Sequence, residues 1–337
     1  MAPPTPPFLP GGTGQGAEVT DPLRVLTWHV HGSYLWYQSH VPVTWLLPVT
    51  EDRGPGYVGR GETFDWPDNV VEVPAEQVRD TEVDVVLTQH RTNWESDRFD
   101  LLGHRVHELP RVHVEHDPPP HWPNEALHPV QDEQATLVHV TPFNALMWDS
   151  GVTPSRTVDH GVVVPEGLEW TGERDTAITV VNNLYRRGRR LGPDVFDRVA
   201  AEVPVDLAGM NGDACPRWLG DVKLTELHRR LPEYRAFFNP IRYTSLGLAV
   251  CEAMALGLPV VGLATTEMST AVRNGVNGYV ETDPDRLVPH LRRLLADRDE
   301  AAELSAGARR VAAERFGIER FVADWLDVLQ TAVRSRA

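Results

Sequence analysis

Residues 237–280 read FFNPIRYTSLGLAVCEAMALGLPVVGLATTEMSTAVRNGVNGYV, and this stretch decides the fold class. Its first apolar residues end at Asn239-Pro240 and have the length of a buried strand. A turn of small residues follows, and the apolar run from Thr244 to Gly257 has the length of a helix. The next run, PVVGLA, predicts another strand. Strand, helix and strand in this order are typical of a parallel α/β sheet, which binds ligands beyond the carboxyl ends of its strands.

The same alternation continues along the rest of the chain in both directions. Strands are predicted at 24–30, 83–90, 111–117, 135–141, 176–184, 205–210, 234–240 and 259–264. Helices follow several of these strands, and two of them are expected to begin at Pro142 and Pro193, because proline suits a first helical turn. From Pro284 onward the pattern is helical almost to the end.

The order of these elements predicts two domains. Residues 160–175 combine Pro, Gly and charged residues without periodicity, which indicates a boundary. We expect a Pro- and Gly-rich disordered tail at 1–20, an N-terminal Rossmann-like acceptor domain at 21–162, a linker at 163–175, a C-terminal Rossmann-like nucleotide-sugar domain at 176–316 and an amphipathic helix at 317–337 that crosses back.

Composition excludes several classes of protein. The 337 residues suffice for two domains, and 41% hydrophobic with 24% charged residues is the composition of a globular chain. A net charge of −16 argues against a nucleic-acid partner, which needs a broad basic face. No apolar run approaches the roughly 20 residues of a membrane helix, and the first residues lack the pattern of a signal peptide. Cys215 and Cys251 share no motif spacing, so neither a disulfide framework nor a zinc site is indicated. We therefore expect a cytoplasmic protein; its oligomeric state stays open.

Glu252 is the first candidate for a ligand contact. It lies eight residues after Thr244, about 12 Å along a helix that begins there. A helix start offers free amides to a diphosphate, so a ribose near Glu252 and a sugar near the helix start would lie one diphosphate apart. The alternative is an ordinary buried helix with one tolerated glutamate, which would be costly without a partner.

These motifs resemble the donor site of the retaining GT-B glycosyltransferases of family four. The resemblance is carried by Glu252-Ala253-Met254-Ala255, by Gly257 to Val261 and by the Asn274 to Gly278 turn. Thr244 stands where that family has the first of two glutamates, which places the identity of the transferred sugar in question. The likeness covers the C-terminal half well and the N-terminal half more loosely. It implies a GT-B fold of two facing Rossmann-like domains and a nucleoside diphosphate sugar as co-substrate.

The resemblance implies a role for several residues. It assigns Glu252 to the ribose hydroxyls and the amides of Ser245 to Leu248 to the phosphates and sugar, and Arg187-Gly188 has the place of a family lysine-glycine pair. Arg186, Arg187, Arg189 and Arg190 crowd five positions of an acidic chain, and guanidinium groups bind diphosphates well; a solvated basic edge is the alternative. The donor-binding candidates are Gly32, Arg186, Arg187, Asn239, Thr244, Ser245, Leu246, Gly247, Leu248 and Glu252.

The N-terminal half supplies the remaining candidates. His116 ends a strand and precedes three prolines. Similar enzymes place a histidine in this region against the donor sugar, which makes His116 a catalytic candidate. Arg187, from the arginine cluster, is the second catalytic candidate. The acceptor-side candidates are His31, Tyr34, Trp36 and Asp117, and Tyr37, Trp94 and Trp122 are further aromatic side chains that stack on sugar rings or simply pack.

Two other patterns have a simpler interpretation. His29, His31, Glu115, His116, Asp117 and His139 offer metal-ligand types without the spacing of a ligand pair, so we expect no metal and no cofactor. Residues 54–59, GPGYVG, match the G-x-G-x-x-G pattern of dinucleotide sites. That pattern needs a following helix, which RGETFDWP does not predict.

The expected function is transfer of a sugar from a nucleoside diphosphate sugar to a small-molecule or glycan acceptor, such as a sugar or natural product. Helix amides and arginine, rather than a metal, would stabilise the leaving group, and the resemblance implies retention of configuration. Two alternatives stay open. A sugar-nucleotide epimerase or hydrolase on the same fold would release nucleotide without an acceptor, whereas a non-catalytic binding protein would bind nucleotide without turnover.

Overall fold

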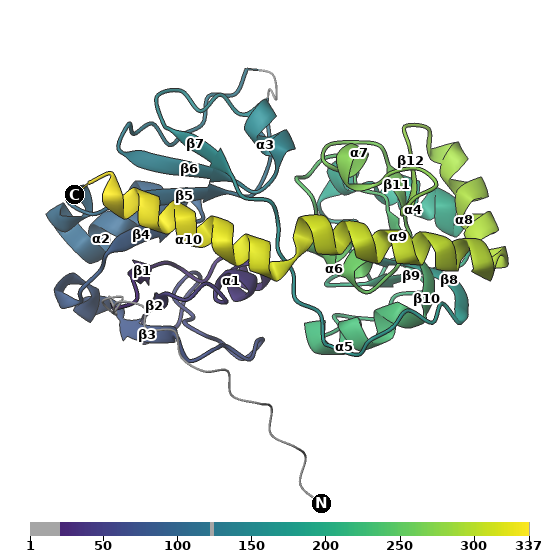
Figure 1. Cartoon of the computed structure of the whole chain (residues 1–337), viewed down its shortest axis with the longest axis horizontal. Helices are drawn as coiled ribbons and strands as arrows, with labels where there is room; N and C mark the ends of the chain where they lie inside the picture. Colours follow the sequence, from purple (N-terminus) through teal and green to yellow (C-terminus); the bar gives the residue numbers. More distant parts are fainter. Residues whose placement is uncertain (1–20, 122–124, 337) are drawn as a thin grey trace, which may run out of the picture.

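A computed structural model of the chain describes residues 21–121 and 125–336, and it contains two α/β domains (Figure 1). The predicted tail at 1–20 and Trp122 lie outside the described residues. Each domain is a parallel sheet with helices packed on it, as the alternation of strands and helices predicts.

The N-terminal domain is built on a sheet of seven parallel strands in the order β3-β2-β1-β4-β5-β6-β7. The strands are β1 (Arg24–Leu26), β2 (Thr44–Val49), β3 (Val70–Pro74), β4 (Val85–Thr88), β5 (Arg111–Glu115), β6 (Ala135–His139) and β7 (Ser155–Thr157). Helices α1 (Gly32–Gln38), α2 (Arg98–Leu102) and α3 (Pro142–Met147) join them. β1 lies between β2 and β4, so the strand order reverses beside it, where α/β sheets bind ligands.

The C-terminal domain has a five-stranded parallel sheet in the order β12-β11-β10-β8-β9. The strands are β8 (Arg174–Val180), β9 (Val205–Ala208), β10 (Tyr234–Asn239), β11 (Val260–Leu263) and β12 (Gly278–Glu281). The helices are α4 (Pro193–Ala200), α5 (Leu224–Arg230), α6 (Leu248–Ala255), α7 (Met268–Ala271) and α8 (Leu287–Ala296). β8 and β10 are neighbours, although β9 comes between them in sequence, so this sheet also reverses its order.

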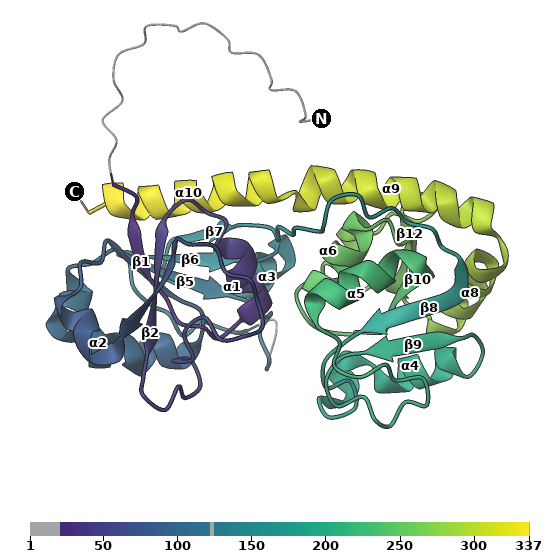
Figure 2. The same ribbon diagram turned by 90° about the horizontal axis from the view of Figure 1, so that it is seen from below.

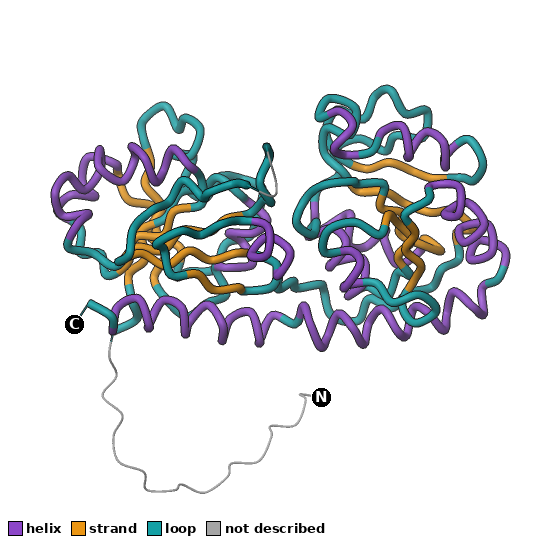
Figure 3. The backbone as a smooth tube through the Cα atoms, turned by 90° about the horizontal axis from the view of Figure 1, so that it is seen from above, coloured by secondary structure: helices purple, strands orange, loops and turns teal. Residues whose placement is uncertain are grey.

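The last two helices connect the domains. Helix α9 (Arg298–Phe316) belongs to the C-terminal domain, and after the extended Gly317 helix α10 (Ile318–Arg334) continues across the N-terminal domain. The two helices run one after the other along one side of both domains (Figures 2 and 3). The predicted crossing helix is thereby confirmed.

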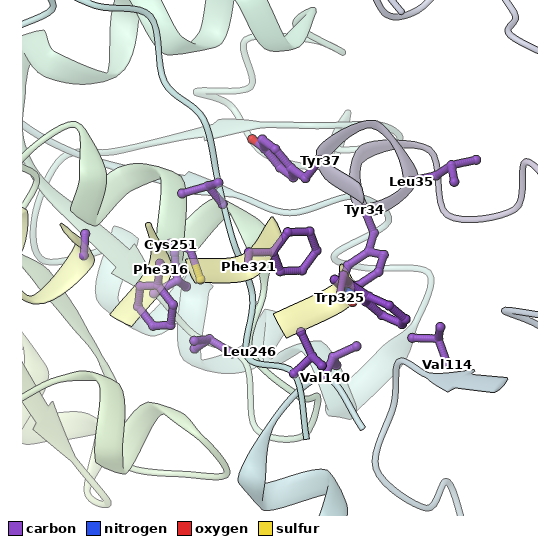
Figure 4. Close-up of a cluster of buried hydrophobic side chains, with 14 of the residues drawn as sticks. Tyr34, Leu35, Tyr37, Val114, Val140, Leu246, Cys251, Phe316, Phe321 and Trp325 are labelled. Atoms are coloured by element: carbon purple, nitrogen blue, oxygen red, sulfur yellow. Dashed lines mark hydrogen bonds between the residues drawn. The ribbon is translucent and has the colours of Figure 1, made fainter. Parts of the chain in front are cut away.

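Helix α10 buries a row of large side chains against the N-terminal domain. Phe321 and Trp325 are fully buried, and the Trp325 indole donates a hydrogen bond to the Tyr34 hydroxyl (3.1 Å). Phe316 and Cys251 continue the same cluster into the C-terminal domain (Figure 4). One hydrophobic core therefore runs through both domains.

One predicted boundary is wrong. The helix expected to begin near Thr244 begins at Leu248, after Gly247. The preceding carbonyl groups are used elsewhere, because the Ser245 oxygen accepts a bond from the Thr266 hydroxyl and the Leu246 oxygen accepts one from His160 Nε2 (2.7 Å). Glu252 consequently lies only four residues into α6, about 6 Å along its axis, and the estimate of 12 Å does not hold.

The remaining local predictions are mixed. Strands β2, β3, β7 and β12 were not predicted, whereas the starts of α3 and α4 at their prolines are confirmed. The segment after residues 54–59 contains no helix before β3, as predicted, so it lacks the helix start that the dinucleotide pattern requires. Among the described residues, no helix is both long enough and apolar enough to span a bilayer.

Candidate functional site

Two cavities lie at the carboxyl ends of the strands. The interdomain cavity, about 780 Å³, is lined by residues that follow β8 and β9, by the starts of α5 and α6, and by two N-terminal loops. Its lining residues are His29, Gly32, Ser33, Glu62, Thr63, Phe64, Val180, Asn182, Ala208, Gly209, Met210, Asp221, Val222, Lys223, Leu224, Leu227, Leu248, Ala249 and Glu252. Gly32, Leu248 and Glu252 among them are predicted donor-site residues.

Glu252 projects from α6 to the wall of the interdomain cavity. Its side chain is almost buried, and its Oε1 atom accepts a hydrogen bond from the hydroxyl of Tyr37 on α1 (2.7 Å). The Oε2 atom lies 3.6 Å from Nε2 of the buried His228, which is longer than a hydrogen bond. A buried carboxylate with so few partners retains lone pairs for hydroxyl donors from the cavity.

The start of α6 faces the same cavity. Gly247 precedes the helix without any side-chain cap, and the space beside its Cα atom is open. The first amides of a helix have no acceptor within it, so the N–H groups at Leu248 and Ala249 are available to an anion. On the opposite wall, a Cβ atom at Gly32 would lie 3.0 Å from both His29 Nε2 and the Phe64 ring. Glycine therefore fits this tight turn best.

Lys223 is a cavity residue that the sequence patterns do not single out. It is the only lysine of the chain, and it lines the interdomain cavity at the start of α5. The four guanidinium groups of the arginine cluster are a stronger signal in the sequence than one ammonium group. The available signal was its position, since Lys223 follows β9 at the ligand-binding edge of a parallel sheet.

The four arginines of the cluster lie in different surroundings. Arg186 and Arg187 are exposed and line neither cavity. Arg189 pairs with Asp194 on the same domain. Arg190 reaches across the domain boundary to Asp117, with 2.5 Å between Nη2 and Oδ1. The structure therefore does not bring Arg186 and Arg187 together with Glu252.

The N-terminal cavity, about 470 Å³, opens beyond the ends of β1, β4 and β5. Its lining residues are His31, Gln89, His90, Arg91, Trp94, His113, Glu115, His116, Asp117, Pro118, Pro120, His121, Ala126, Leu127, Pro129, Val130, Trp148 and Arg190. His31 and Gly32 are adjacent in sequence but line different cavities, so this loop forms part of the wall between the two.

His116 and His31 form a pair on this wall. Their rings lie 4.0 Å apart, and His116 Nε2 is 3.1 Å from the Gln89 side-chain oxygen. Since that oxygen only accepts, Nε2 carries the proton and Nδ1 holds a lone pair. Burial, together with the neighbouring His31, holds the pKa of His116 well below its usual value, so the ring is neutral at pH 7.

A cluster with metal-ligand spacing lies in the same cavity, and the sequence analysis did not identify it. One ligand atom each from His113, Glu115 and His128 lies within 4.8 Å of the others. His128 Nδ1 accepts a bond from the Val130 amide (3.1 Å), so its proton is on Nε2 and is donated to Glu115 Oε2 (3.0 Å). A metal at Nε2 would need the lone pair that this tautomer does not have, and the residues therefore fit a hydrogen-bonded network better than an ion.

The other predicted residues are distributed as follows. Asp117, His31 and His116 line the N-terminal cavity, as does Trp94. Tyr34 and Trp36 line neither cavity: Tyr34 is buried beneath α10, and the Trp36 indole donates to the Asp65 carbonyl (3.1 Å). Five predicted donor residues near α6 also line neither cavity, namely Asn239, Thr244, Ser245, Leu246 and Gly247.

Part of the chain matches a known family. Residues 200–297 match the family model described as Glycosyl transferases group 1. A D-inositol 3-phosphate glycosyltransferase of Xylanimonas cellulosilytica is 40% identical over 99 residues, which are 29% of this chain and 24% of that protein. One of Stackebrandtia nassauensis is 31% identical over 187 residues, 47% of this chain and 39% of that protein. The chain thus spans about a quarter to two fifths of the length of these curated relatives.

Solved structures with low sequence identity share the whole architecture. Sucrose-phosphate synthase from Thermosynechococcus elongatus has a TM-score of 0.66 at 14% identity, and the match covers 93% of this chain and all of that one. HepE from Anabaena, in complex with UDP and glucose, has a TM-score of 0.66 at 12% identity, with 92% of this chain and all of that one covered. The chain therefore has the GT-B fold, which confirms the predicted fold class.

Proposed function

We propose that this chain, whose residues 200–297 form a glycosyl transferases group 1 domain, transfers a sugar from a nucleoside diphosphate sugar to an acceptor hydroxyl. The donor binds in the interdomain cavity and the acceptor in the N-terminal cavity. One observation carries the proposal: the Glu252 carboxylate and the uncapped start of α6 face one cavity between two Rossmann-like domains. A nucleoside diphosphate matches this arrangement, because its ribose hydroxyls can donate to the carboxylate while its phosphate oxygens accept from the helix amides.

The donor fits the interdomain cavity by the chemistry of its walls. Glu252 accepts hydrogen bonds from the ribose hydroxyls, as the family resemblance implies. The amides at Leu248 and Ala249, one helical turn away, bind the diphosphate, and Lys223 adds a positive charge at the same cavity. HepE, which shares the fold, is described in complex with UDP and glucose.

The acceptor lies on the opposite side of the His31–Gly32 loop. The transferred sugar sits at this loop, between the two cavities, with the neutral His116 ring beside it. Departure of the nucleoside diphosphate is stabilised by helix amides and by Lys223, without a metal or another cofactor. Retention of configuration is what the family resemblance implies for this transfer. Arg186 and Arg187 reach the donor only by a change of loop conformation, so Lys223 replaces them here as the main cationic contact.

Replacement of Glu252 by glutamine tests this function. Glu252→Gln keeps the size of the side chain and removes its charge, and we expect the dissociation constant of the preferred nucleoside diphosphate to rise about 10- to 150-fold, the equivalent of a hydrogen bond to a charged group. Calorimetry with UDP, GDP and ADP measures this change. Glu303→Gln, at an exposed glutamate on α9, is the matched control and leaves the constant unchanged.

Turnover assays complete the test. Transfer from a UDP- or GDP-sugar to an acceptor, undiminished by a chelator, supports the proposal. Unchanged nucleotide affinity in a folded Glu252→Gln variant would remove this residue from the site. Nucleotide release that is equally fast without any acceptor would point to a hydrolase or an epimerase instead.

A further inference from the structure

The floor of the N-terminal cavity holds two polar side chains with unused hydrogen-bonding capacity, His113 and Glu115. His113 on β5 is only 3% exposed, and its Nδ1 atom lies 2.8 Å from the Thr88 hydroxyl. The same hydroxyl lies 3.4 Å from the Val112 carbonyl, longer than an ordinary O–H···O bond, so the contact with the ring is its principal hydrogen bond. The Nε2 atom of His113 has no hydrogen-bond partner among the described residues, although His113 lines the cavity.

Glu115 supplies hydrogen-bond acceptors two residues along the same strand, on the same face of the sheet. Its Oε1 atom accepts from the Asp117 amide (2.8 Å), and its Oε2 atom accepts from His128 Nε2 (3.0 Å). Each carboxylate oxygen has two lone-pair sites, so each retains one for a ligand. Groups that donate hydrogen bonds, such as hydroxyls, complement this floor.

The walls are flat and apolar. Trp94 and Trp148 line the cavity, and the Trp148 ring is fixed because its Nε1 atom donates to the Asp117 carbonyl (2.9 Å). Pro118, Pro120 and Leu127 contribute further apolar surface. Aromatic faces pack well on the C–H surface of a sugar ring, and the volume of about 470 Å³ suits a small molecule.

The cations of the cavity are already paired. Arg91 contacts Glu95 with 2.6 Å between Nε and Oε1, and Arg190 contacts Asp117 at 2.5 Å. A phosphate group on the ligand would compete with Glu95 or Asp117 for these guanidinium groups. It would also approach the Glu115 carboxylate, which repels a like charge. The cavity therefore disfavours an anionic ligand.

We infer that the N-terminal cavity selects an uncharged, polyhydroxylated ring, a sugar or cyclitol without a phosphate, whose hydroxyls form hydrogen bonds with His113 Nε2 and donate to Glu115. Its role as acceptor rests on the proposed function, but the binding itself does not require a nucleotide. His113 is then a specificity-determining residue, because a buried polar nitrogen left without its hydroxyl partner penalises the wrong ligand.

Binding without nucleotide tests the inference directly. Saturation-transfer NMR and calorimetry compare myo-inositol and glucose with their monophosphates. We expect at least one neutral compound to bind and each monophosphate to bind at least about tenfold more weakly than its parent, a difference of 1.4 kcal/mol. His113→Asn keeps a polar group near the Thr88 hydroxyl but has no atom at Nε2, so it weakens binding of the neutral compound about tenfold.

Two further variants distinguish recognition from a structural role. His113→Gln places an amide oxygen near the former Nε2 position and restores part of the affinity. Arg156→Ala, at an exposed arginine of β7 that pairs with Asp327 and lines neither cavity, leaves the affinity for the neutral compound within about twofold. Both variants and His113→Asn should bind nucleoside diphosphate as the unmodified protein does, which shows that they are folded.

Each contrary result has a defined meaning. Tighter binding of a monophosphate than of its parent, lost in Arg91→Ala, overturns the inference in favour of an anionic acceptor. The inference also fails if neither neutral compound binds at a ligand concentration of about 50 mM, which is well above the millimolar dissociation constants of weak ligands. Binding of nucleotide without any neutral ring would leave the proposed donor site intact. Binding of a neutral ring without any nucleotide would contradict the proposed function instead.

Discussion

At the scale of single residues, Glu252 shows how one side chain depends on both domains. It projects from α6 of the C-terminal domain, yet its hydrogen-bond donor is Tyr37 from α1 of the N-terminal domain. The sequence identified Glu252, because an acid in an apolar run needs a partner. It did not identify Tyr37 in this role, since a contact between residues 215 positions apart depends on how the domains pack.

Tyr37→Phe removes this partner without changing the shape of the core. The buried carboxylate then loses a hydrogen bond, and we expect the free energy of unfolding to fall by about 1.5–3 kcal/mol. Urea denaturation measures the change. Tyr185→Phe is the control, since it removes an equally short hydrogen bond to Asp197 at an exposed position. If the free energy of unfolding falls equally in the two variants, the burial of Glu252 does not strengthen its hydrogen bond with Tyr37.

Several predicted donor residues lie outside both cavities, and for Arg186 and Arg187 the reason is physical. Arg186 and Arg187 were chosen for their charge and their place after a strand, but a loop conformation decides where a long side chain points, and both are exposed. Lys223 and His113 line cavities although neither belongs to a recognised motif. Patterns in sequence predict the edge of the sheet at which ligands bind better than they predict the side chains that reach them.

At the scale of elements, most of the buried parallel strands and the amphipathic α10 were predictable, whereas the buried β2 and the start of α6 were not. Apolar runs identify strands that are covered on both faces. The start of α6 depends on His160 and Thr266, which bind the carbonyls of Leu246 and Ser245 and stop the helix from extending backwards. Such tertiary contacts leave no periodic signal in the segment itself.

Trp325 anchors α10 to the N-terminal domain, and its replacement tests the importance of the crossing helix. Trp325→Ala leaves a large cavity and removes the hydrogen bond to Tyr34, so we expect a loss of about 3–5 kcal/mol in the free energy of unfolding. Denaturant unfolding followed by fluorescence and circular dichroism measures it. Gln330→Ala, at an exposed position of the same helix, should change stability by less than about 0.5 kcal/mol. Similar losses in both variants would refute a special role for Trp325.

At the scale of the whole molecule, buried histidines make stability depend on pH. Burial lowers the pKa of His31, His113, His116, His139 and His160, and that of His139 falls to about 4. The unfolded chain therefore binds more protons than the folded one below about pH 6.5. Stability from this source is complete above pH 6.5 and decreases as the pH falls towards 4.

We expect the urea midpoint of unfolding to fall as the pH is lowered from 7 to 5. This pH interval lies above the range in which most carboxylates titrate, so the fall reports on the histidines. His139→Gln should reduce this fall, because its ring is buried and Nδ1 has no partner among the described residues. His104→Gln, at an exposed histidine, should leave the fall unchanged. A midpoint that stays constant between pH 7 and pH 5 would contradict the argument.

The crossing of α10 has a consequence for the order in which the protein folds during synthesis. Residues 174–316 are continuous in sequence, so the C-terminal domain can close around its own sheet as soon as Phe316 leaves the ribosome. The N-terminal domain is made earlier, but the apolar surface around Tyr34 stays uncovered until Phe321 and Trp325 have been translated. The half of the chain that is synthesised first is therefore completed last, and over that interval it is the half most exposed to aggregation and to chaperones.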